Sequence, residues 1–293
     1  MSLTGTIQSI FGGIGVGAIY ALLGLSFALI FGRLNIASVL HGDLAILAAY
    51  LIYFFYTNAG INLFIVTIAL LPIFYFLGYI IQLGLLRPFM SLDVWKGRYQ
   101  GQVMVTQGTA MIIMALEFMV WTGTYRTLGV PYRNSAINLG SLKLSIVHLM
   151  SFVALICLVL ILNYILDKTR YGISLRACSD DRTTAMLTGI DYNKISNVSF
   201  GISAVISVVA GLFYALSFAL TPSLGMDLTL KGWVAVIVGG MGSISGIVVA
   251  GLLVGLVESL SSYFWIPAYK DAVLFIGLLI FLVVKPAGLM AKK

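Results

Sequence analysis

A few polar side chains interrupt a sequence that is otherwise apolar, and they are the candidates for chemistry. Asn35, His41 and Asp43 gather where one apolar run ends and the next begins, and Gly42 beside them permits a bent backbone. An ionised residue at the centre of a bilayer costs roughly 2.5 to 3.5 kcal/mol, so such groups usually face a cavity, a partner or the membrane surface. Two interpretations follow: a discontinuous helix beside a solute path, or a turn at the membrane surface.

Two further acids, Glu117 and Glu258, also lie inside apolar runs. Each could line a path, pair with a lysine such as Lys231 or Lys270, or reach the membrane surface. No nucleophile, base and orienting group can be placed together, and the two cysteines are too few for a metal cluster or a disulfide framework. We therefore expect no enzyme, no metal and no cofactor in this chain.

Composition indicates that most of the chain lies in lipid. Hydrophobic residues make up 60% of the 293 residues, charged residues only 9%, and the mean hydropathy is +1.06. The net charge of +7 comes from basic residues that lie mainly between apolar runs, where they set membrane topology, so nucleic-acid binding is not expected. Because backbone groups must be satisfied inside lipid, we predict an all-α, polytopic helical bundle.

The apolar runs predict about eight spans in a single domain, 1–293. Seven are simple runs, near 7–32, 39–57, 61–86, 102–123, 145–166, 195–220 and 268–285. The region 231–264 is too long for one span, and we expect it to be broken or re-entrant at the stretch GGMGSISG. Its glycines permit a tight turn or close helix packing, with Gly242 and Gly246 spaced for a small-residue contact; the candidate hinge glycines are Gly239, Gly240, Gly242 and Gly246.

Basic residues predict the orientation. The loop 167–194 is rich in lysine and arginine, which favours the cytoplasm, and so do Lys285, Lys292 and Lys293 near the C-terminus. The loop 167–194 and the C-terminal lysines lie on the same side of the membrane only if the broken region crosses it as two segments. The N-terminus and the loop 124–144 are then placed outside.

The most polar stretch, RACSDDRTTAMLTGID at 176–191, predicts a short helix on the cytoplasmic side. Ser179 or Asp180 is a plausible N-cap, Asp181 would lie in the first turn, and Gly189 would end the helix. These signals enclose about two turns, 181–188.

This short helix presents an apolar knob of Ala185, Met186 and Leu187, and Ile190 could fold back on Ala185. Two interpretations are open. The knob could insert into a groove of a soluble partner, or the helix could rest on the membrane surface through its arginines.

The chain resembles the membrane permease subunits of ATP-binding cassette importers for branched-chain amino acids. The resemblance rests on GAIYALLGLSFALIFG, HGDLAILAAYL, TRYGISLRACSDDRTTAMLTGIDYNKI, KGWVAVIVGGMGSISGIVVAGLLVGLVE and the closing YKDAVLFIGLLIFLVVKPAGL. It implies that the polar stretch is the coupling segment that docks on an ATPase. The matching residues are Arg176, Ala177, Asp181, Ala185, Leu187, Gly189 and Ile190, together with Met186 of the knob.

The resemblance also implies a multi-pass protein of the bacterial inner membrane and several partners. These are a second related permease, two cytoplasmic ATPases that bind ATP and Mg, and a periplasmic or lipid-tethered solute-binding protein. Members of this family usually have the pattern Asn-x-Ala-His-Gly. In this sequence, Ser38, Val39 and Leu40 are inserted between Asn-Ile-Ala at 35–37 and His41. Urea, short amides or other amino acids are therefore alternative solutes. An ion-coupled transporter is a further alternative, for which Glu117 would be the deep acid.

Overall fold

The computed structural model describes residues 3–90, 97–133, 135–139, 142–264 and 267–290. It confirms the helical bundle. Within the described residues, seven helices are long and apolar enough to cross a membrane: Thr4–Leu34, Leu63–Met90, Arg98–Trp121, Ile146–Lys168, Tyr192–Ser217, Ile244–Phe264 and Pro267–Val284. Each coincides with an apolar run seen in the sequence.

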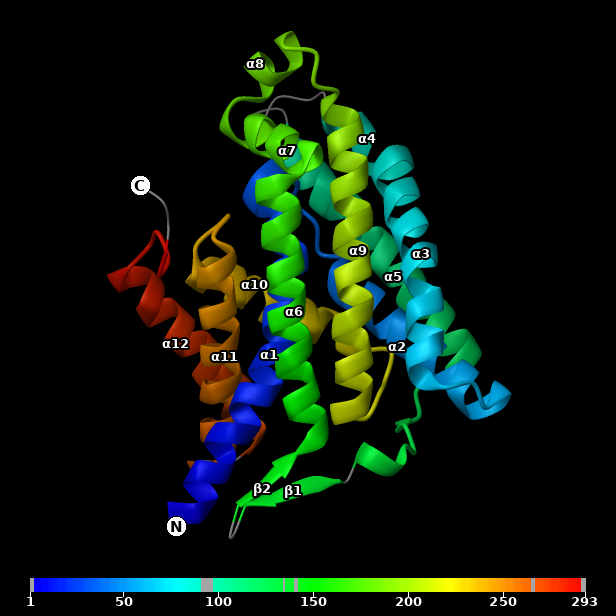
Figure 1. The fold of residues 1–293 in the computed structure, drawn as a ribbon, viewed down its shortest axis with the longest axis vertical. Coiled ribbons are helices and arrows are strands. Elements are labelled where there is room, and N and C mark those ends of the chain that lie inside the picture. The colour runs from blue at the N-terminus through cyan, green and yellow to red at the C-terminus, as the bar shows by residue number, and fades with distance from the viewer. Residues whose placement is uncertain (1–2, 91–96, 134, 140–141, 265–266, 291–293) are drawn as a thin grey trace.

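Apart from the short α4, α7 and α8, successive helices alternate direction along the chain (Figure 1). In order they are α1 (Leu3–Leu34), α2 (His41–Ala59), α3 (Leu63–Ile81), α4 (Arg87–Met90), α5 (Arg98–Trp121), α6 (Ile146–Lys168), α7 (Arg170–Asp180), α8 (Arg182–Leu187), α9 (Tyr192–Ser217), α10 (Leu224–Gly239), α11 (Ile244–Phe264) and α12 (Lys270–Val284). A π-helical segment, Gln82–Leu86, joins α3 to α4. Before α6, a hairpin of β1 (Ala136–Leu139) and β2 (Leu142–Ser145) pairs antiparallel, with Ile137 opposite Leu144; the sequence did not predict it.

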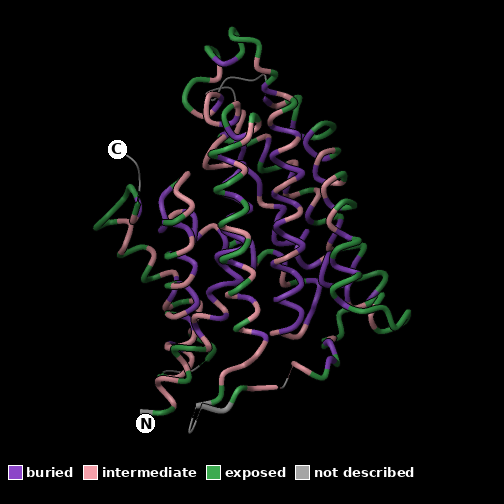
Figure 2. Tube along the Cα trace, viewed as in Figure 1, coloured by how far each residue is buried: buried purple, intermediate pink, exposed green. Residues whose placement is uncertain are grey.

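Two ends of the bundle differ in character. One carries α7 and α8, and the other carries the N-terminus and the hairpin (Figure 1); we call them the α8 end and the hairpin end. The helices α1 and α9 are buried over most of their length, whereas α12 is largely exposed (Figure 2). The core therefore forms around α1 and α9, and the outer helices present apolar side chains that suit lipid or a partner subunit.

Two helices, α2 and α10, begin inside the bundle. Each follows a non-helical segment, 35–40 before α2 and 218–223 before α10, and their N-terminal turns pack against each other. The Gly42 amide donates a hydrogen bond to Thr229 Oγ1 at 3.1 Å, and this hydroxyl donates to the carbonyl of Val39 at 3.1 Å. A Cβ on Gly42 would overlap the carbonyl oxygen of Gly225, so the close approach requires glycine. We call this contact the α2–α10 junction.

The predicted break in 231–264 is confirmed, as a turn between α10 and α11. Gly240 and Gly242 adopt positive φ angles of 94° and 89°, which favour glycine. The expectation that Gly242 and Gly246 form one small-residue face of a packed helix is wrong, because Gly242 lies in the turn and not on a helix. Instead Gly246 packs against Gly239 across the turn, and Gly242 packs against Gly32 of α1.

A buried ion-pair network holds α10 against α11 and α12. The Lys231 ammonium lies 3.1 Å from Asp227, 3.1 Å from Glu258 and 3.4 Å from Asp271, and Lys270 lies 2.6 Å from Glu258. Of the roles open to Glu258, pairing with a lysine is therefore the one that the structure shows. The mutual attraction of these groups offsets the cost of removing them from water.

The α2–α10 junction predicts that Gly42→Ala destabilises the protein. The new methyl group meets backbone atoms of α10 that cannot rotate away, and overpacking of this kind costs about 1 to 3 kcal/mol. Gly108→Ala is the matched control, because nothing lies near its Cβ position in α5 and alanine favours a helix by about 0.5 to 1 kcal/mol. Unfolding midpoints in one detergent measure both; a Gly42→Ala midpoint at or above the wild-type value would contradict the close contact.

The ion-pair network predicts that Lys231→Met lowers stability strongly. The substitution removes one of the two cations that pair with the buried Glu258 and leaves it only Lys270, so the cost is that of a lost hydrogen bond between charged groups, about 1.5 to 3 kcal/mol. Lys194→Met, which breaks an exposed pair with Asp191, should cost at most about 1 kcal/mol. The same unfolding measurement compares the two variants, and equal effects would show that the buried network contributes no special stability.

Candidate functional site

The polar stretch forms two helices where the sequence predicted one. Residues that were expected to cap the short helix, Ser179 and Asp180, end α7, which begins at Arg170 after the N-cap Thr169. The N-cap of α8 is Asp181, whose carboxylate accepts hydrogen bonds from the amides of Thr183 at 2.8 Å and Thr184 at 3.2 Å. The predicted N-cap was wrong because α7 continues into these residues.

The Asp181 cap is held in its charged form. The Thr184 hydroxyl donates to the carboxylate at 2.5 Å, and this bond, with those from the two amides, holds the pKa of Asp181 below its ordinary value. The lowered pKa means that the stabilisation is present at neutral pH and is lost as the pH falls through the folded-state value. The start of α8 is therefore fixed under physiological conditions.

The predicted end of α8 is confirmed. Gly189 adopts φ 88°, and its amide donates to the carbonyl of Met186 at 3.1 Å. The Ile190 amide returns to the carbonyl of Ala185 at 3.2 Å, which places Ile190 back beside Ala185 as expected. These paired bonds are the usual glycine stop of a helix.

The apolar knob is smaller than the sequence suggested. Ala185 is buried, with 4% of its surface exposed, because it faces the rest of the bundle. Met186 and Leu187 are exposed by 51% and 84%. We call these two residues the α8 tip. Apolar side chains this exposed at a bundle end suit insertion into a groove of another protein.

The α8 helix is tied to three other helices through contacts that sequence reasoning missed. Arg182 donates to the carbonyl of Met90 at 2.9 Å, and its guanidinium lies 4.0 Å from the ring centroid of Tyr192 at the start of α9. The Tyr192 hydroxyl donates to the carbonyl of Leu34, the last residue of α1. The sequence signal for these contacts was a basic residue, Arg182, close to the apolar residues of the tip. The preference of basic residues for the cytoplasmic side already accounted for it, so no contact was predicted.

The other candidate residues in this region belong to α7. Arg176 pairs with Asp167 at 3.3 Å in a largely exposed bridge, and Ala177 is half-buried against the core. The coupling candidates therefore lie on two helices, and those that project furthest are the two residues of the α8 tip.

Asn35, His41 and Asp43 do not gather as the sequence suggested. Asn35 is exposed with φ 53° at the end of α1, whereas His41 and Asp43 are buried at the α2–α10 junction. His41 Nε2 lies 2.8 Å from the Ser203 hydroxyl of α9. Because the segment 35–40 runs into the bundle, His41 and Asp43 lie at an interior break and not in the expected turn at the membrane surface, whereas Asn35 stays outside the break.

Glu117 is deeper than its position near a helix end suggested. Its side chain is fully buried, on the face of α5 that packs against α2, and it interacts electrostatically with Asp43. No described residue forms a hydrogen bond with either carboxyl oxygen. Glu117 thus differs from Glu258, which is paired with two lysines.

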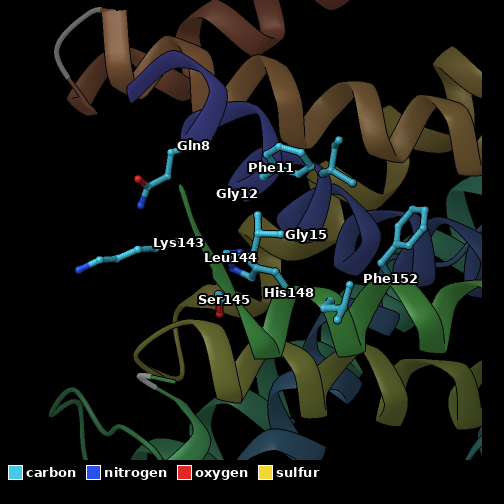
Figure 3. A pocket seen from close by; sticks show the side chains of 11 residues that line it. Gln8, Phe11, Gly12, Gly15, Lys143, Leu144, Ser145, His148 and Phe152 are labelled. Carbon is cyan, nitrogen blue, oxygen red and sulfur yellow. The ribbon is translucent and has the colours of Figure 1, made fainter. Parts of the chain in front are cut away.

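Two cavities open near the hairpin end. One, of about 460 Å³, lies between α1 and the hairpin-to-α6 segment, where Phe11, Leu149 and Phe152 give it apolar walls and Lys143 extends away from the other labelled residues (Figure 3). The other, of about 510 Å³, is lined by aromatic and hydroxyl side chains: Tyr53, Tyr56, Thr57 and Thr127, with Gly60 and Gly129. Only the second adjoins α2 and the loop after α5. No group of three or more His, Cys, Asp or Glu within the described ranges could hold a metal ion.

Comparison with known proteins gives the family. The model of the family described as "Branched-chain amino acid transport system / permease component" matches residues 9–284. The high-affinity branched-chain amino acid transport system permease protein LivH of Salmonella typhimurium is 25% identical over 98% of this chain and 96% of its own length, and BraD of Pseudomonas aeruginosa is 24% identical over the same shares.

A fructose import permease protein, FrcC of Rhizobium meliloti, is 26% identical over 52% of this chain and 45% of its own length. No solved structure shows significant similarity to the chain. The family match covers all the spans and the α7–α8 region. This multi-pass membrane protein therefore belongs to the family of branched-chain amino acid transport system permease components.

Proposed function

We propose that this chain is the membrane permease subunit of an ATP-binding cassette importer for branched-chain amino acids. The observation that carries the proposal is the match of the permease family and of full-length relatives over nearly the whole chain. The α8 tip supports it, because an apolar projection at one bundle end suits docking on a soluble motor. The chain acts as a single permease domain, 1–293.

The proposed orientation places the α8 end in the cytoplasm and the hairpin end outside the bacterial inner membrane. Lys168, Arg170, Arg176 and Lys194 at the α8 end favour this orientation; Lys292 and Lys293, which argued the same way, lie outside the described residues. Two ATPases that bind ATP and Mg then meet the α8 end, and a periplasmic or lipid-tethered binding protein meets the hairpin end. A second related permease completes the path.

The proposed mechanism is mechanical. Closure of the ATPase pair moves the α8 tip, and Arg182 passes this motion to α9 through Tyr192 and to α4 through the Met90 carbonyl. On α9, Ser203 contacts His41 at the start of α2, so a shift of α9 bears on the α2–α10 junction. The residues proposed for the path are Asn35, His41, Gly42, Asp43 and Glu117, with the glycines 239, 240, 242 and 246 as a hinge.

Uptake by the reconstituted complex with its own binding protein tests which solute is transported. We expect ATP-dependent accumulation of labelled leucine, isoleucine or valine in proteoliposomes. Fructose, urea and short amides form the comparison panel, because a fructose permease is among the relatives. Uptake of one of these in place of the branched-chain amino acids would contradict the proposed solute, and uptake driven by an ion gradient without ATP would contradict the importer class.

The α8 tip predicts that Leu187→Asp separates ATP hydrolysis from uptake. An exposed charge leaves the fold intact but opposes insertion into an apolar groove, and burying an unpaired carboxylate costs several kcal/mol. We expect uptake to fall about tenfold or more while membrane insertion is unchanged. Thr183→Asp adds the same charge to an exposed residue one turn before Leu187, at the N-terminal end of α8 and outside the tip, and should retain uptake. Full ATP-dependent uptake by Leu187→Asp would rule out docking through the tip.

A further inference from the structure

A group of buried polar atoms between α2 and α5 has no hydrogen-bond partner among the described residues. It comprises both carboxyl oxygens of Glu117, the hydroxyl of Tyr50 and the indole Nε1 of Trp121. Glu117 and Tyr50 are fully buried and Trp121 is 8% exposed. Buried polar groups are nearly always satisfied in folded proteins, so three of them at one place indicate a site that takes a polar ligand.

The arrangement of these side chains suits a cation that donates hydrogen bonds. Glu117 and Trp121 are four residues apart and share one face of α5. The ring of Tyr50 stacks on Trp121 with centroids 5.0 Å apart, and Phe54 meets the same indole edge-on at 6.3 Å. A carboxylate bordered by aromatic rings binds an ammonium group through charge, hydrogen bonds and cation–π attraction.

A positive group lies beside the C-terminal end of α5. Arg126, in the loop after α5, donates from Nε and Nη2 to the carbonyl of Trp121 at 3.1 and 2.9 Å. Its guanidinium lies 5.7 Å from the ring centroid of Tyr53, which lines the 510 Å³ cavity at the hairpin end. Arg126 therefore contacts both Tyr53 at this cavity and the carbonyl of Trp121 at the end of α5.

A second buried acid, Asp43, lies further inward along α2 than Tyr50. It interacts electrostatically with Glu117 and is buried against Gly225 at the α2–α10 junction. The junction is closely packed, because neither Gly42 nor Gly225 has room for a Cβ. Along α2 from the hairpin end, the residues come in the order Tyr53 at the cavity, Tyr50 stacked on Trp121, and Asp43 at the packed junction.

We propose that Glu117, with Tyr50 and Trp121, receives the ammonium group of a zwitterionic amino acid that arrives from the hairpin end, and that Arg126 faces its carboxylate. The site holds the solute outside the α2–α10 junction until the junction opens. This inference rests on the proposed function and names the residues that contact the solute within it.

Protection of Glu117 from a hydrophobic carbodiimide tests the site without relying on transport. Carboxyl groups buried in a membrane react with such reagents, and mass spectrometry of the complex resolves the Glu117 peptide from that of Glu258, an internal control fixed by two lysines. We expect saturating leucine to slow the labelling of Glu117 about tenfold and to leave Glu258 unchanged. The amine 3-methylbutylamine should also protect, whereas 4-methylpentanoate, which lacks the ammonium group, should not.

Two results would overturn the inference. One is equal labelling of Glu117 with and without leucine, and the other is protection by 4-methylpentanoate as strong as that by leucine. If leucine is imported and Glu117 is not protected, only this site is wrong. If the uptake panel shows that fructose or urea is the solute, the proposed function itself fails.

The variant Glu117→Gln provides a second test, in which both uptake and the unfolding midpoint are measured. We expect kcat/KM for leucine uptake to fall about tenfold, as loss of a charged hydrogen bond implies, with an unfolding midpoint at least equal to that of the wild type. Thr109→Val, which removes a hydroxyl bonded to a backbone carbonyl of the same helix, should retain uptake. Wild-type uptake by Glu117→Gln would contradict the assignment.

Discussion

The contact between the N-termini of α2 and α10 is the constraint on which the rest of the bundle depends. A helix that begins inside a membrane leaves its first amides without partners, and lipid offers none. Here Thr229 of α10 accepts from the Gly42 amide and donates to the carbonyl of Val39, so one side chain satisfies two backbone groups at the start of α2. The contact is possible only because glycine stands on each helix, and the long helices α1 and α9 surround it.

The helix α9 connects the α8 end to the α2–α10 junction in the interior of the bundle. The α8 helix contacts Tyr192 at the start of α9, and Ser203 further along α9 contacts His41 at the start of α2. A helix transmits displacement along its axis with little loss because its hydrogen bonds are internal. This continuous path supports a mechanical role for α9.

The spans and the glycine break could be predicted from the sequence because lipid imposes strong rules. Apolar length gave the helices, and Gly240 and Gly242 gave the turn, since few other residues adopt their φ angles. The α7 helix was missed because its buried face is short and weakly apolar, consisting of Gly172, Leu175 and Cys178, and its polar residues were assigned to the loop before the short helix. The burial of Ala185 and the separation of Asn35 from His41 depend on which way the chain turns in space, and neither spacing nor residue type records that direction.

Glu117 and Glu258 show how one residue type reaches opposite roles. Both acids lie in apolar helices, and each faces the same cost of leaving water. The ammonium groups of Lys231 and Lys270 lie 3.1 and 2.6 Å from Glu258, so this acid forms ion pairs that join α10, α11 and α12. Around Glu117, the neighbours are aromatic rings and another acid, which supply no such charge. A protein that only required stability would gain by replacing Glu117 with an apolar residue, and its presence there is therefore best explained by a ligand that brings the missing positive charge.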